Sequence, residues 1–411
     1  MRILYLHQYF KKPTENGGTR SYDLATSFLK LGYDVNMITT TSEKKSKNSK
    51  RWEVEEVDGI IVHYLYLPYE NSFSFLKRIM IFLQFMYFSS IKLLQLKGDM
   101  VLATSTPLTI GIPAILKKII HKTPYIFEVR DVWPEAVVAI GAIKNQIALS
   151  ALKKLEYVIY KNAKFIVPLS IDMKSSILNR YPEFNFKILE VIENIAEVNR
   201  FKPVYHENDL KLLSLENLIG FNPLVSILYA GTFGKVNHIE YVIELAKKVL
   251  TQDRNIVFLL LGSGSEKELL IKYANDLGVL NKNLFFLRPV NKDELPILYS
   301  QITIGSSFVA PIKELWANSA NKFFDTLASG HPILINHLGW QAKKISENGI
   351  GYVLPPDINE VDVKSFVSYL NNEDELKLSG IRAREIAEKN YSLAVAVQKY
   401  NRIFKNCIVN S

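Results

Sequence analysis

The segment 318–333 combines a predicted helix start with a cation and an acid, a set of groups that can bind a phosphate ester. Asn318 and Ser319 are residue types that cap helix N-termini, so we expect a helix to begin directly after them. The free N–H groups and partial positive charge at such a start attract a diphosphate. Lys322 adds a full charge in the first turn, and Asp325, one turn further on, could hydrogen-bond a ribose. An ordinary capped helix leading into a strand would show the same residues, so the segment alone leaves both interpretations open.

Three glycine-bearing loops follow apolar runs. They are Gly17–Gly18, Gly231–Gly234 and Gly262–Gly264. Glycine permits positive φ and close approach of the backbone, so such loops can bring main-chain N–H groups to a phosphate. Taken singly, each of these loops would more often be a simple turn.

The charged pair Arg130 and Asp131 directly follows the apolar run Tyr125–Val129, which is a predicted strand. Ligands bind at the carboxyl ends of the strands in open parallel sheets. The position therefore predicts that this pair orients a substrate. The alternative is a surface Arg–Asp pair without a ligand.

Apolar runs alternate with amphipathic stretches along the whole chain. The predicted strands are Ile3–Leu6, Val35–Thr39, Ile60–Tyr66, Met100–Ala103, Tyr125–Val129 and Phe165–Pro168, and the series restarts with Ser226–Tyr229, Ile256–Leu261, Leu284–Leu287, Ile302–Ile304 and Ile333–Ile335. Strands that alternate with helices are typical of an α/β fold with a parallel, doubly wound sheet. The restart predicts two Rossmann-like domains that face each other across a central cleft.

The expected boundaries follow from this alternation and from a polar stretch in the middle of the chain. Residues 1–200 form the N-terminal domain, 201–222 a linker and 223–385 the C-terminal domain. The last residues, 386–411, are predicted to form a helix that packs back toward the N-terminal domain. A length of 411 residues agrees with two or three domains.

The composition is that of a globular protein with a large core, since 48% of the residues are apolar and 22% charged. Cys407 is the one cysteine, which excludes an internal disulfide and a thiolate metal cluster. No HExxH or DxD motif occurs, so we expect neither a metal nor another cofactor. The apolar run after Met1 is too short for a signal peptide, which predicts a cytoplasmic protein.

The net charge of +9 is concentrated in the first part of the chain. Residues 1–185 hold 25 Lys and Arg against 16 Asp and Glu, whereas the remainder holds 25 of each. Such asymmetry indicates an anionic partner for the N-terminal domain, which could be membrane phospholipid, a diphosphate or nucleic acid. A charged face that serves only solubility is the alternative.

Residues 73–97 contain many large apolar side chains between basic ends. Phe82, Phe85 and Tyr87 lie in this stretch, and Lys77 and Lys92 lie beside them. Aromatic and aliphatic residues bordered by basic ones are typical of a helix that lies on anionic lipid. Within this apolar stretch, the longest window without a charge has only 13 residues, from 79 to 91, which is too short to span a bilayer as a helix. A core helix of the N-terminal domain would also explain the stretch.

Several segments of the chain, among them 318–333 and the glycine-bearing loops, resemble the retaining glycosyltransferases of family 4. The resemblance extends over residues 1 to about 400. The donor-site helix of that family resembles Thr326-Leu327-Ala328-Ser329-Gly330-His331-Pro332-Ile333, with Asp325 at the second acidic position. The first acidic position falls on Ala317, so that half of the motif is missing. Asn321-Lys322 before an aromatic run resembles the branch of WbuB-like N-acetylfucosamine transferases of O-antigen and capsule synthesis.

Further strings resemble the loops of the same family. His7-Gln8-Tyr9-Phe10 with Gly17-Gly18-Thr19-Arg20, Glu128-Val129-Arg130-Asp131-Val132-Trp133-Pro134, Glu193-Asn194 and Tyr229-Ala230-Gly231-Thr232-Phe233-Gly234-Lys235 match its landmarks. Most members carry an arginine and a lysine for the diphosphate where this chain has Thr232 and His238. The resemblance therefore implies Lys322 as the main cation, helped by Lys235, with Gly17, Gly18, Gly231, Gly262, Gly264, Asn321 and Asp325 also at the donor.

The resemblance implies a GT-B-fold enzyme that moves a sugar, with retention of configuration, from a nucleotide diphosphate donor. The expected donor is a UDP-sugar carrying an N-acetylated hexosamine or deoxyhexosamine, and the expected acceptor is a polyprenyl-diphosphate-linked glycan. Lys322, Asp131 and Arg130 would be the catalytic residues, and the N-terminal domain would bind the acceptor. The protein would then be peripheral on the inner face of the cytoplasmic membrane, with no nucleic-acid partner. A UDP-sugar 2-epimerase of GT-B fold and a non-catalytic docking subunit remain alternatives.

Overall fold

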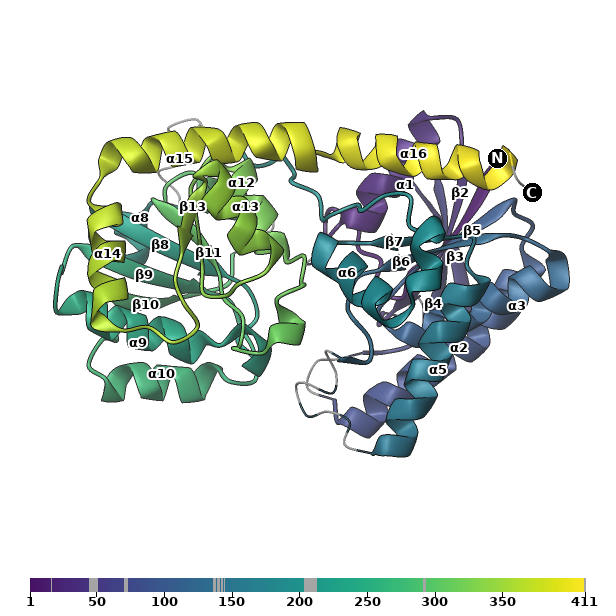
Figure 1. The fold of residues 1–411 in the computed structure, drawn as a ribbon, viewed down its shortest axis with the longest axis horizontal. Coiled ribbons are helices and arrows are strands. Elements are labelled where there is room, and N and C mark those ends of the chain that lie inside the picture. The colour runs from purple at the N-terminus through teal and green to yellow at the C-terminus, as the bar shows by residue number, and fades with distance from the viewer. Residues whose placement is uncertain are drawn as a thin grey trace. The chain divides into compact units, whose positions relative to one another are not determined.

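The protein forms two compact units, Met1–Glu193 with Leu393–Ser411, and Asn194–Ser392 (Figure 1). The computed structural model describes residues 1–15, 17–43, 51–69, 73–135, 138, 141, 143, 145–202, 213–290 and 293–409. Against the predicted boundaries, the first unit ends at Glu193 rather than at residue 200. Of the predicted linker, residues 203–212 lie outside the described residues.

The first unit is built on a seven-stranded sheet. Its strands are, in spatial order, β3 (Trp52–Val57), β4 (Ile60–Tyr66), β2 (Asp34–Thr41), β1 (Arg2–Leu6), β5 (Met100–Thr104), β6 (Tyr125–Val129) and β7 (Phe165–Pro168). All neighbours pair in parallel except β3 with β4. The sequence prediction missed β3, because this edge strand alternates acidic with apolar residues and has little buried surface.

Helices cover both faces of this sheet. They are α1 (Arg20–Lys30), α2 (Phe75–Gln95), η1 (Leu108–Ile110), α3 (Gly111–His121), α5 (Gln146–Asn162), α6 (Ile171–Arg180), η2 (Pro182–Lys187) and α16 (Leu393–Val409). Figure 1 shows α2, α3 and α5 together on one side of the sheet, and their buried apolar residues share a cluster with Leu4 and Leu6 of β1. On the other side, α16 packs against α1, where the Tyr400 and Phe404 rings contact Phe28.

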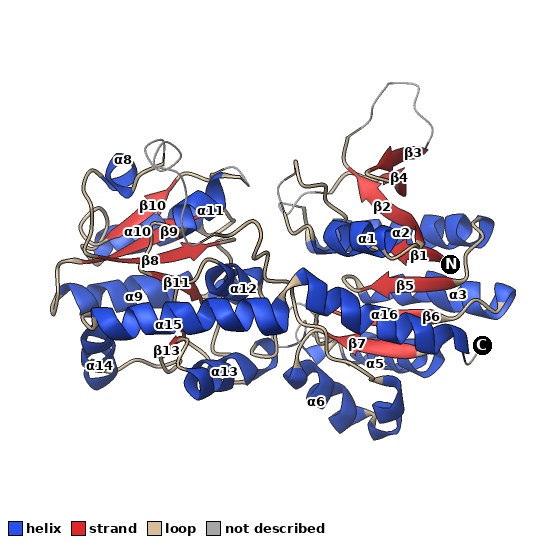
Figure 2. Ribbon diagram, turned by 90° about the horizontal axis from the view of Figure 1, so that it is seen from above, coloured by secondary structure: helices blue, strands red, loops and turns tan. Residues whose placement is uncertain are grey.

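The second unit contains a six-stranded sheet in which every pair is parallel. Its spatial order is β10 (Leu284–Leu287), β9 (Ile256–Leu261), β8 (Val225–Ala230), β11 (Ile304–Ser307), β12 (Ile333–Ile335) and β13 (Gly351–Val353). Each face carries its own apolar core cluster, and helices flank the strands (Figure 2). The two Rossmann-like sheets of the α/β prediction are therefore confirmed, and the short β13 is an additional strand.

The helical segments of the second unit connect these strands. They are α8 (Leu215–Ile219), η3 (Lys235–Asn237), α9 (Ile239–Leu250), α10 (Lys267–Asp276), α11 (Glu294–Tyr299), η4 (Lys313–Leu315), α12 (Asn321–Ala328), α13 (Trp340–Asn348), α14 (Glu360–Leu370), α15 (Glu373–Ile386) and the π-turn η5 (Ala387–Tyr391). The helix predicted for residues 386–411 begins later, at Leu393, because η5 separates α15 from α16. Residues 386–392 belong to the second unit, and α16 belongs to the first. Among the described residues, none of the helices is both long and apolar enough to cross a bilayer.

A buried ion pair lies at the centre of the first unit. Arg20 Nε and Nη2 donate to Glu128 Oε2 at 3.3 and 3.0 Å, and both side chains are buried. Thr104 Oγ1 donates to Glu128 Oε1 at 2.5 Å, and Tyr400 of α16 donates to Oε2. Burial alone would raise the pKa of Glu128, but Arg20 and these hydrogen bonds outweigh it and lower the pKa from 4.5 to about 2. The carboxylate therefore stays charged and joins β6, α1 and α16.

We predict that Arg20→Met lowers the free energy of unfolding by about 3–5 kcal/mol at pH 7, because it leaves Glu128 charged and buried without its cation. The double variant Arg20→Met/Glu128→Gln should recover part of this loss. Because the folded pKa of Glu128 lies below its ordinary value, its contribution is complete above pH 4.5 and is lost as the pH falls toward 2. Urea denaturation at pH 7 and pH 3 measures both effects, and an unchanged midpoint for Arg20→Met would contradict the prediction.

Candidate functional site

Two glycine loops meet at the carboxyl edge of the second sheet, where β8 and β9 end. Gly231 N donates to Leu261 O and Phe233 N donates to Ser263 O, both at 2.9 Å. A Cβ added to Gly262, whose φ is +153°, would lie 1.9 Å from Gly231 O, and one added to Gly264 would lie 2.0 Å from Phe233 O. The glycines at 262 and 264 are therefore required for the contact between the loops.

Lys322 of α12 lies against the first of these loops. A Cβ on Gly231 would lie 2.7 Å from Lys322 Cε and 3.0 Å from Nζ, so a larger residue would force the end of the lysine side chain to move. The ammonium group also lies 5.0 Å from the centre of the Tyr229 ring. Burial lowers the pKa of Lys322 to about 8, against the opposing effect of the Asp325 carboxylate. Within the described residues Lys322 forms no salt bridge, so its charge is available to an anion.

The N-terminus of α12 differs from the sequence prediction. The N-cap is Ala320, without a side-chain cap, and the helix begins at Asn321. Asn318 Oδ1 accepts from Ala320 N at 3.1 Å, whereas Ser319 Oγ accepts from Asn194 N at 3.1 Å. The Asn194 amide also donates to Ser319 O and to Asn321 Oδ1. The capping roles predicted for Asn318 and Ser319 were therefore wrong, because both side chains hold the preceding loop in place.

Asn194 is a supporting residue that the site prediction omitted. It is buried and binds both the loop before α12 and Asn321. Its sequence signal was the string Glu193-Asn194, which was noted only as a landmark of the family resemblance. The sequence does not indicate these contacts, because Asn194 lies more than 120 positions from Ser319 and Asn321.

The other predicted donor residues follow β8 in the same loop. Thr232 is exposed, and its carbonyl accepts from Tyr229 Oη at 2.8 Å and from Asn237 Nδ2 at 2.9 Å. Lys235 is exposed at the start of η3. His238 has φ +47° at the N-cap of α9, and its buried Nδ1 lacks a hydrogen-bond partner among the described atoms. This loop therefore presents polar groups at the sheet edge that also carries Lys322.

A hydrogen-bonded chain of three residues lies at the carboxyl edge of the first sheet. Arg130 Nη1 lies 3.2 Å from His7 Nε2, and His7 Nδ1 lies 2.8 Å from Ser21 Oγ. A guanidinium only donates, so Nε2 accepts and the Nδ1 proton is directed at Ser21. Burial, followed by the charge of Arg130, lowers the pKa of His7 to about 3. His7 is therefore a neutral, positioned ring, which the site prediction omitted although its string was recognised.

Asp131 is exposed beside this chain and accepts a hydrogen bond from Thr106 Oγ1. Gly17 and Gly18 are also exposed, and Gly17 has φ +128°, a conformation that favours glycine. A Cβ there would lie 3.3 Å from Lys11 Cγ. The loop leads into α1, whose N-cap Thr19 makes no side-chain cap. Among the described residues, no side chain caps the main-chain N–H groups at this helix start.

The three aromatic residues predicted for membrane contact have different environments. Phe85 is completely buried in the core, so its predicted exposure to lipid was wrong. Phe82 is partly buried, with its ring stacked 6.5 Å from that of Tyr69. Tyr87 is 58% exposed. The helix therefore has one core face and one exposed face, and the sequence had left these two readings as alternatives.

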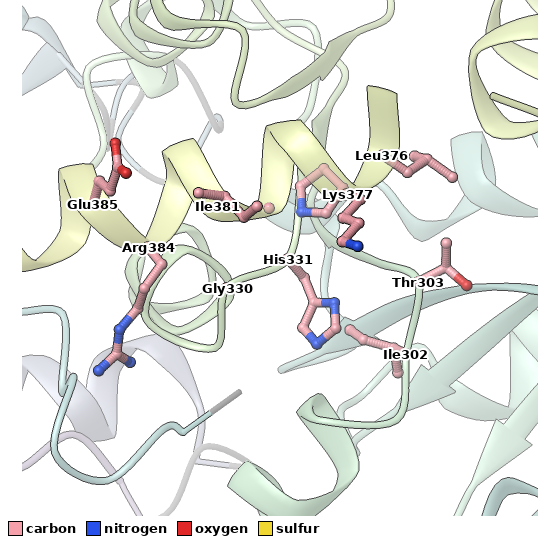
Figure 3. Close-up of a pocket in the computed structure, with 11 residues that line it drawn as sticks. Ile302, Thr303, Gly330, His331, Leu376, Lys377, Ile381, Arg384 and Glu385 are labelled. Atoms are coloured by element: carbon pink, nitrogen blue, oxygen red, sulfur yellow. The ribbon is translucent and has the colours of Figure 1, made fainter. Parts of the chain in front are cut away.

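A cavity of about 570 Å³ lies at the opposite, amino edge of the second sheet. It is lined by residues that precede β11 and β12, such as Thr303 and His331, and by α15 residues such as Lys377 and Ile381 (Figure 3). Burial lowers the pKa of His331 to about 4. Since the loops around Lys322 lie at the carboxyl edge, this cavity does not belong to the candidate donor site.

Two Rossmann-like sheets of this kind define the GT-B class, and solved structures of that class share the fold. Sucrose-phosphate synthase from Thermosynechococcus elongatus is 15% identical, with a TM-score of 0.75 over 100% of both chains. HepE from Anabaena, in complex with UDP and glucose, is 13% identical with a TM-score of 0.66, over 99% of this chain and 100% of that one. WaaG, a glycosyltransferase involved in lipopolysaccharide biosynthesis, is 13% identical with a TM-score of 0.67, over 98% and 99%.

Sequence comparisons point to the same class. Residues 223–385 match the family described as "Glycosyl transferases group 1". The probable glycosyltransferase WbjE of Pseudomonas aeruginosa is 23% identical over 74% of each chain. The uncharacterized glycosyltransferase MJ1069 of Methanocaldococcus jannaschii is 20% identical over 64% of each, so the match spans less than two thirds of that relative. These findings show the GT-B fold and a similarity to group 1 glycosyltransferases, whereas family 4 and its WbuB-like branch stay predictions.

We predict that Gly231→Ala weakens binding of a nucleoside diphosphate about tenfold or more, because the added methyl group displaces the Lys322 ammonium. Gly234→Ala is the matched control, since its Cβ would meet only Thr232 Cγ2 at 4.0 Å. Isothermal titration with UDP measures both variants, after circular dichroism has shown that they fold. Equal affinities for the two variants would contradict a phosphate role for this loop.

Proposed function

We propose that this protein transfers a sugar from a UDP-sugar to a lipid-linked sugar acceptor, with retention of configuration, in the synthesis of an O-antigen or capsule polysaccharide. The proposed sugar is an N-acetylated hexosamine or deoxyhexosamine. The single observation that carries the proposal is the position of Lys322, a partly buried cation without a salt-bridge partner among the described residues, held against Gly231 at the carboxyl edge of the second sheet.

The leaving group of such a reaction is a nucleoside diphosphate, on which negative charge grows in the transition state. A fixed cation in a partly dehydrated site stabilises that charge more than water does. Lys322 supplies the cation, and Asn321 lies beside it at the start of α12, whose N-terminus is open to an anion. Asp325 is the proposed ribose ligand one turn further on. The proposal requires no metal ion.

The remaining proposed roles belong to the first unit. Arg130 is held by the neutral His7 ring, and Asp131 is exposed next to it. We assign both to positioning the sugar and the acceptor hydroxyl. The hydroxyl attacks from the face that the diphosphate leaves, the new glycosidic bond forms as the bond to the phosphate oxygen breaks, and the departing phosphate takes the hydroxyl proton.

Names of related proteins support the polysaccharide setting. WaaG acts in lipopolysaccharide biosynthesis, and HepE binds UDP and glucose. WbjE is a probable glycosyltransferase. A direct test is a donor screen with the purified protein and a polyprenyl-diphosphate-linked sugar, in which labelled sugar must appear in the lipid extract. A protein that binds UDP but labels no lipid would favour an epimerase or a docking subunit.

We predict that Lys322→Ala lowers the rate of transfer about a hundredfold or more, which is the usual effect of removing one preorganised charge from a transition state. In the wild-type protein, kcat/KM should be highest below pH 8 and fall as the pH rises through about 8, because Lys322 then loses its proton. Lys322→Arg should remove this alkaline decline, whatever its absolute rate, since a guanidinium stays charged. An unchanged rate for folded Lys322→Ala would refute the assignment.

We further propose that α2 binds the membrane through its exposed face. Leu76, Met80, Leu83, Tyr87 and Ile91 recur every three or four residues, so they share one face, and all five are exposed. Lys77 and Lys92 belong to the same helix, and neither has a salt-bridge partner among the described residues. An exposed apolar stripe beside free cations suits the surface of an anionic bilayer.

We predict that the triple variant Leu76→Ser/Met80→Ser/Leu83→Ser loses more than tenfold in affinity for vesicles, because each apolar side chain contributes about 1.5 kcal/mol or more when buried in lipid. The control variant, Leu224→Ser/Leu269→Ser/Val361→Ser, removes three exposed apolar side chains that lie in the second unit. Co-sedimentation with anionic vesicles at low and high salt gives the measurement. Salt should weaken wild-type binding, since each nearby cation contributes about 1 kcal/mol. Equal binding by both triple variants would exclude α2 as the contact.

A further inference from the structure

The exposed stripe of α2 borders a cavity of about 410 Å³ in the first unit. Arg51, Tyr66, Leu67, Leu83, Gln84, Tyr87 and Phe88 line it. Most of these side chains are apolar or aromatic, and the one full charge among them belongs to Arg51. Cavities of this size bind small molecules or the end of a larger one.

The cavity lies at the functional edge of the first sheet. Tyr66 ends β4, which runs parallel to β2, and β2 runs parallel to β1. The carboxyl end of β4 is therefore at the same edge as His7, which follows β1. A molecule bound in the cavity would extend from the exposed face of α2 toward the edge that holds His7 and Arg130.

Arg51 supplies an exposed cation at this cavity. Its guanidinium carbon lies 4.1 Å from the centre of the Phe88 ring, a cation–π distance that restrains the plane of the group. Two more cations of this region are held in the same way, Lys92 at 5.0 Å from the Trp52 ring and Lys77 at 3.3 Å from the Phe73 ring. None of the three has a carboxylate partner among the described residues. Within the described part of the chain, these charges are therefore open to an anion.

We infer that this cavity binds the diphosphate end and the first isoprene units of a lipid-linked acceptor. Arg51 donates to the phosphate oxygens, for which its planar fork is suited. Leu67, Leu83 and Phe88 contact the branched hydrocarbon chain, which continues along Tyr87 and the exposed stripe into the membrane. The cation complements the diphosphate, and the apolar wall complements the hydrocarbon chain of such a lipid. The inference rests on the proposed function, because it names the substrate class of the same enzyme.

The experiment is isothermal titration of the full chain with farnesyl diphosphate as the probe. We expect saturable binding that falls at least tenfold in Arg51→Gln and in Leu83→Ser. Arg254→Gln and Leu269→Ser are matched controls, since both residues are exposed in the second unit. Both control variants should bind the probe as the wild type does. Farnesol, which lacks the diphosphate, and inorganic pyrophosphate, which lacks the chain, should each bind at least tenfold more weakly than farnesyl diphosphate.

Equal binding by Arg51→Gln and Arg254→Gln would overturn the inference, as would binding of farnesol as tight as that of the diphosphate. Arg51→Lys keeps the charge but loses the planar fork, and it should give an intermediate affinity. This second variant covers the case in which Arg51→Gln fails to fold.

Failure of the inference and failure of the proposed function give different results. Transfer to the lipid-linked acceptor that is unchanged in Arg51→Gln would refute the cavity but support the enzyme. Binding of farnesyl diphosphate that depends on Arg51 and Leu83, with no transfer from any UDP-sugar, would support the cavity but refute the enzyme.

Discussion

Close main-chain contact between two glycine-bearing loops is the constraint on which the candidate donor site depends. The loops after β8 and β9 meet through main-chain hydrogen bonds, and a methyl group at Gly262 or Gly264 would overlap the opposing carbonyl oxygen. Gly231 also lacks a side chain, and the end of the Lys322 side chain lies in the space beside it. Because an ammonium group in that space is partly dehydrated, its pKa falls to about 8 and its attraction for an anion increases.

In the first unit, a buried ion pair holds the elements that carry the candidate site residues. Glu128 and Arg20 lie in the core, where each alone would be costly, and they are stabilised by one another, by Thr104 and by Tyr400. This network joins β6 to α1 and α16, and β6 leads directly into Arg130 and Asp131. The position of the exposed charges therefore depends on an ion pair that does not itself contact solvent.

Helix α2 shows how one element can satisfy both interpretations of its sequence. Ile81, Phe85 and Leu93 face the core, whereas Leu76, Met80 and Leu83 are exposed. The sequence analysis had treated a core helix and a membrane helix as alternatives, but a helix that is apolar around most of its circumference has enough apolar residues for both faces. The exposed face is the part of the helix that does not pack against the core.

The sequence alone predicted the two α/β repeats and nearly all of the strands, and it singled out Lys322, Gly231 and Arg130 as candidate site residues. These features depend on local patterns, namely apolar runs of strand length, glycines after strands and charges at strand ends, which can be recognised without knowing the contacts. The edge strand β3 was missed because its surface is mostly exposed. The η5 turn within the predicted C-terminal helix was missed because no proline or glycine marks it.

Only the tertiary structure decided which side chains meet. Asn194 with Ser319 and Asn321, His7 with Ser21 and Arg130, and Arg51 with Phe88 are separated by 14 to 127 positions along the chain. Likewise, the faces of α2 were assigned only by its packing, which buried Phe85 and exposed Tyr87. A local pattern specifies where a chain can form a helix or strand. A pairing between distant residues depends instead on how the elements pack, which local patterns in a single sequence do not reveal.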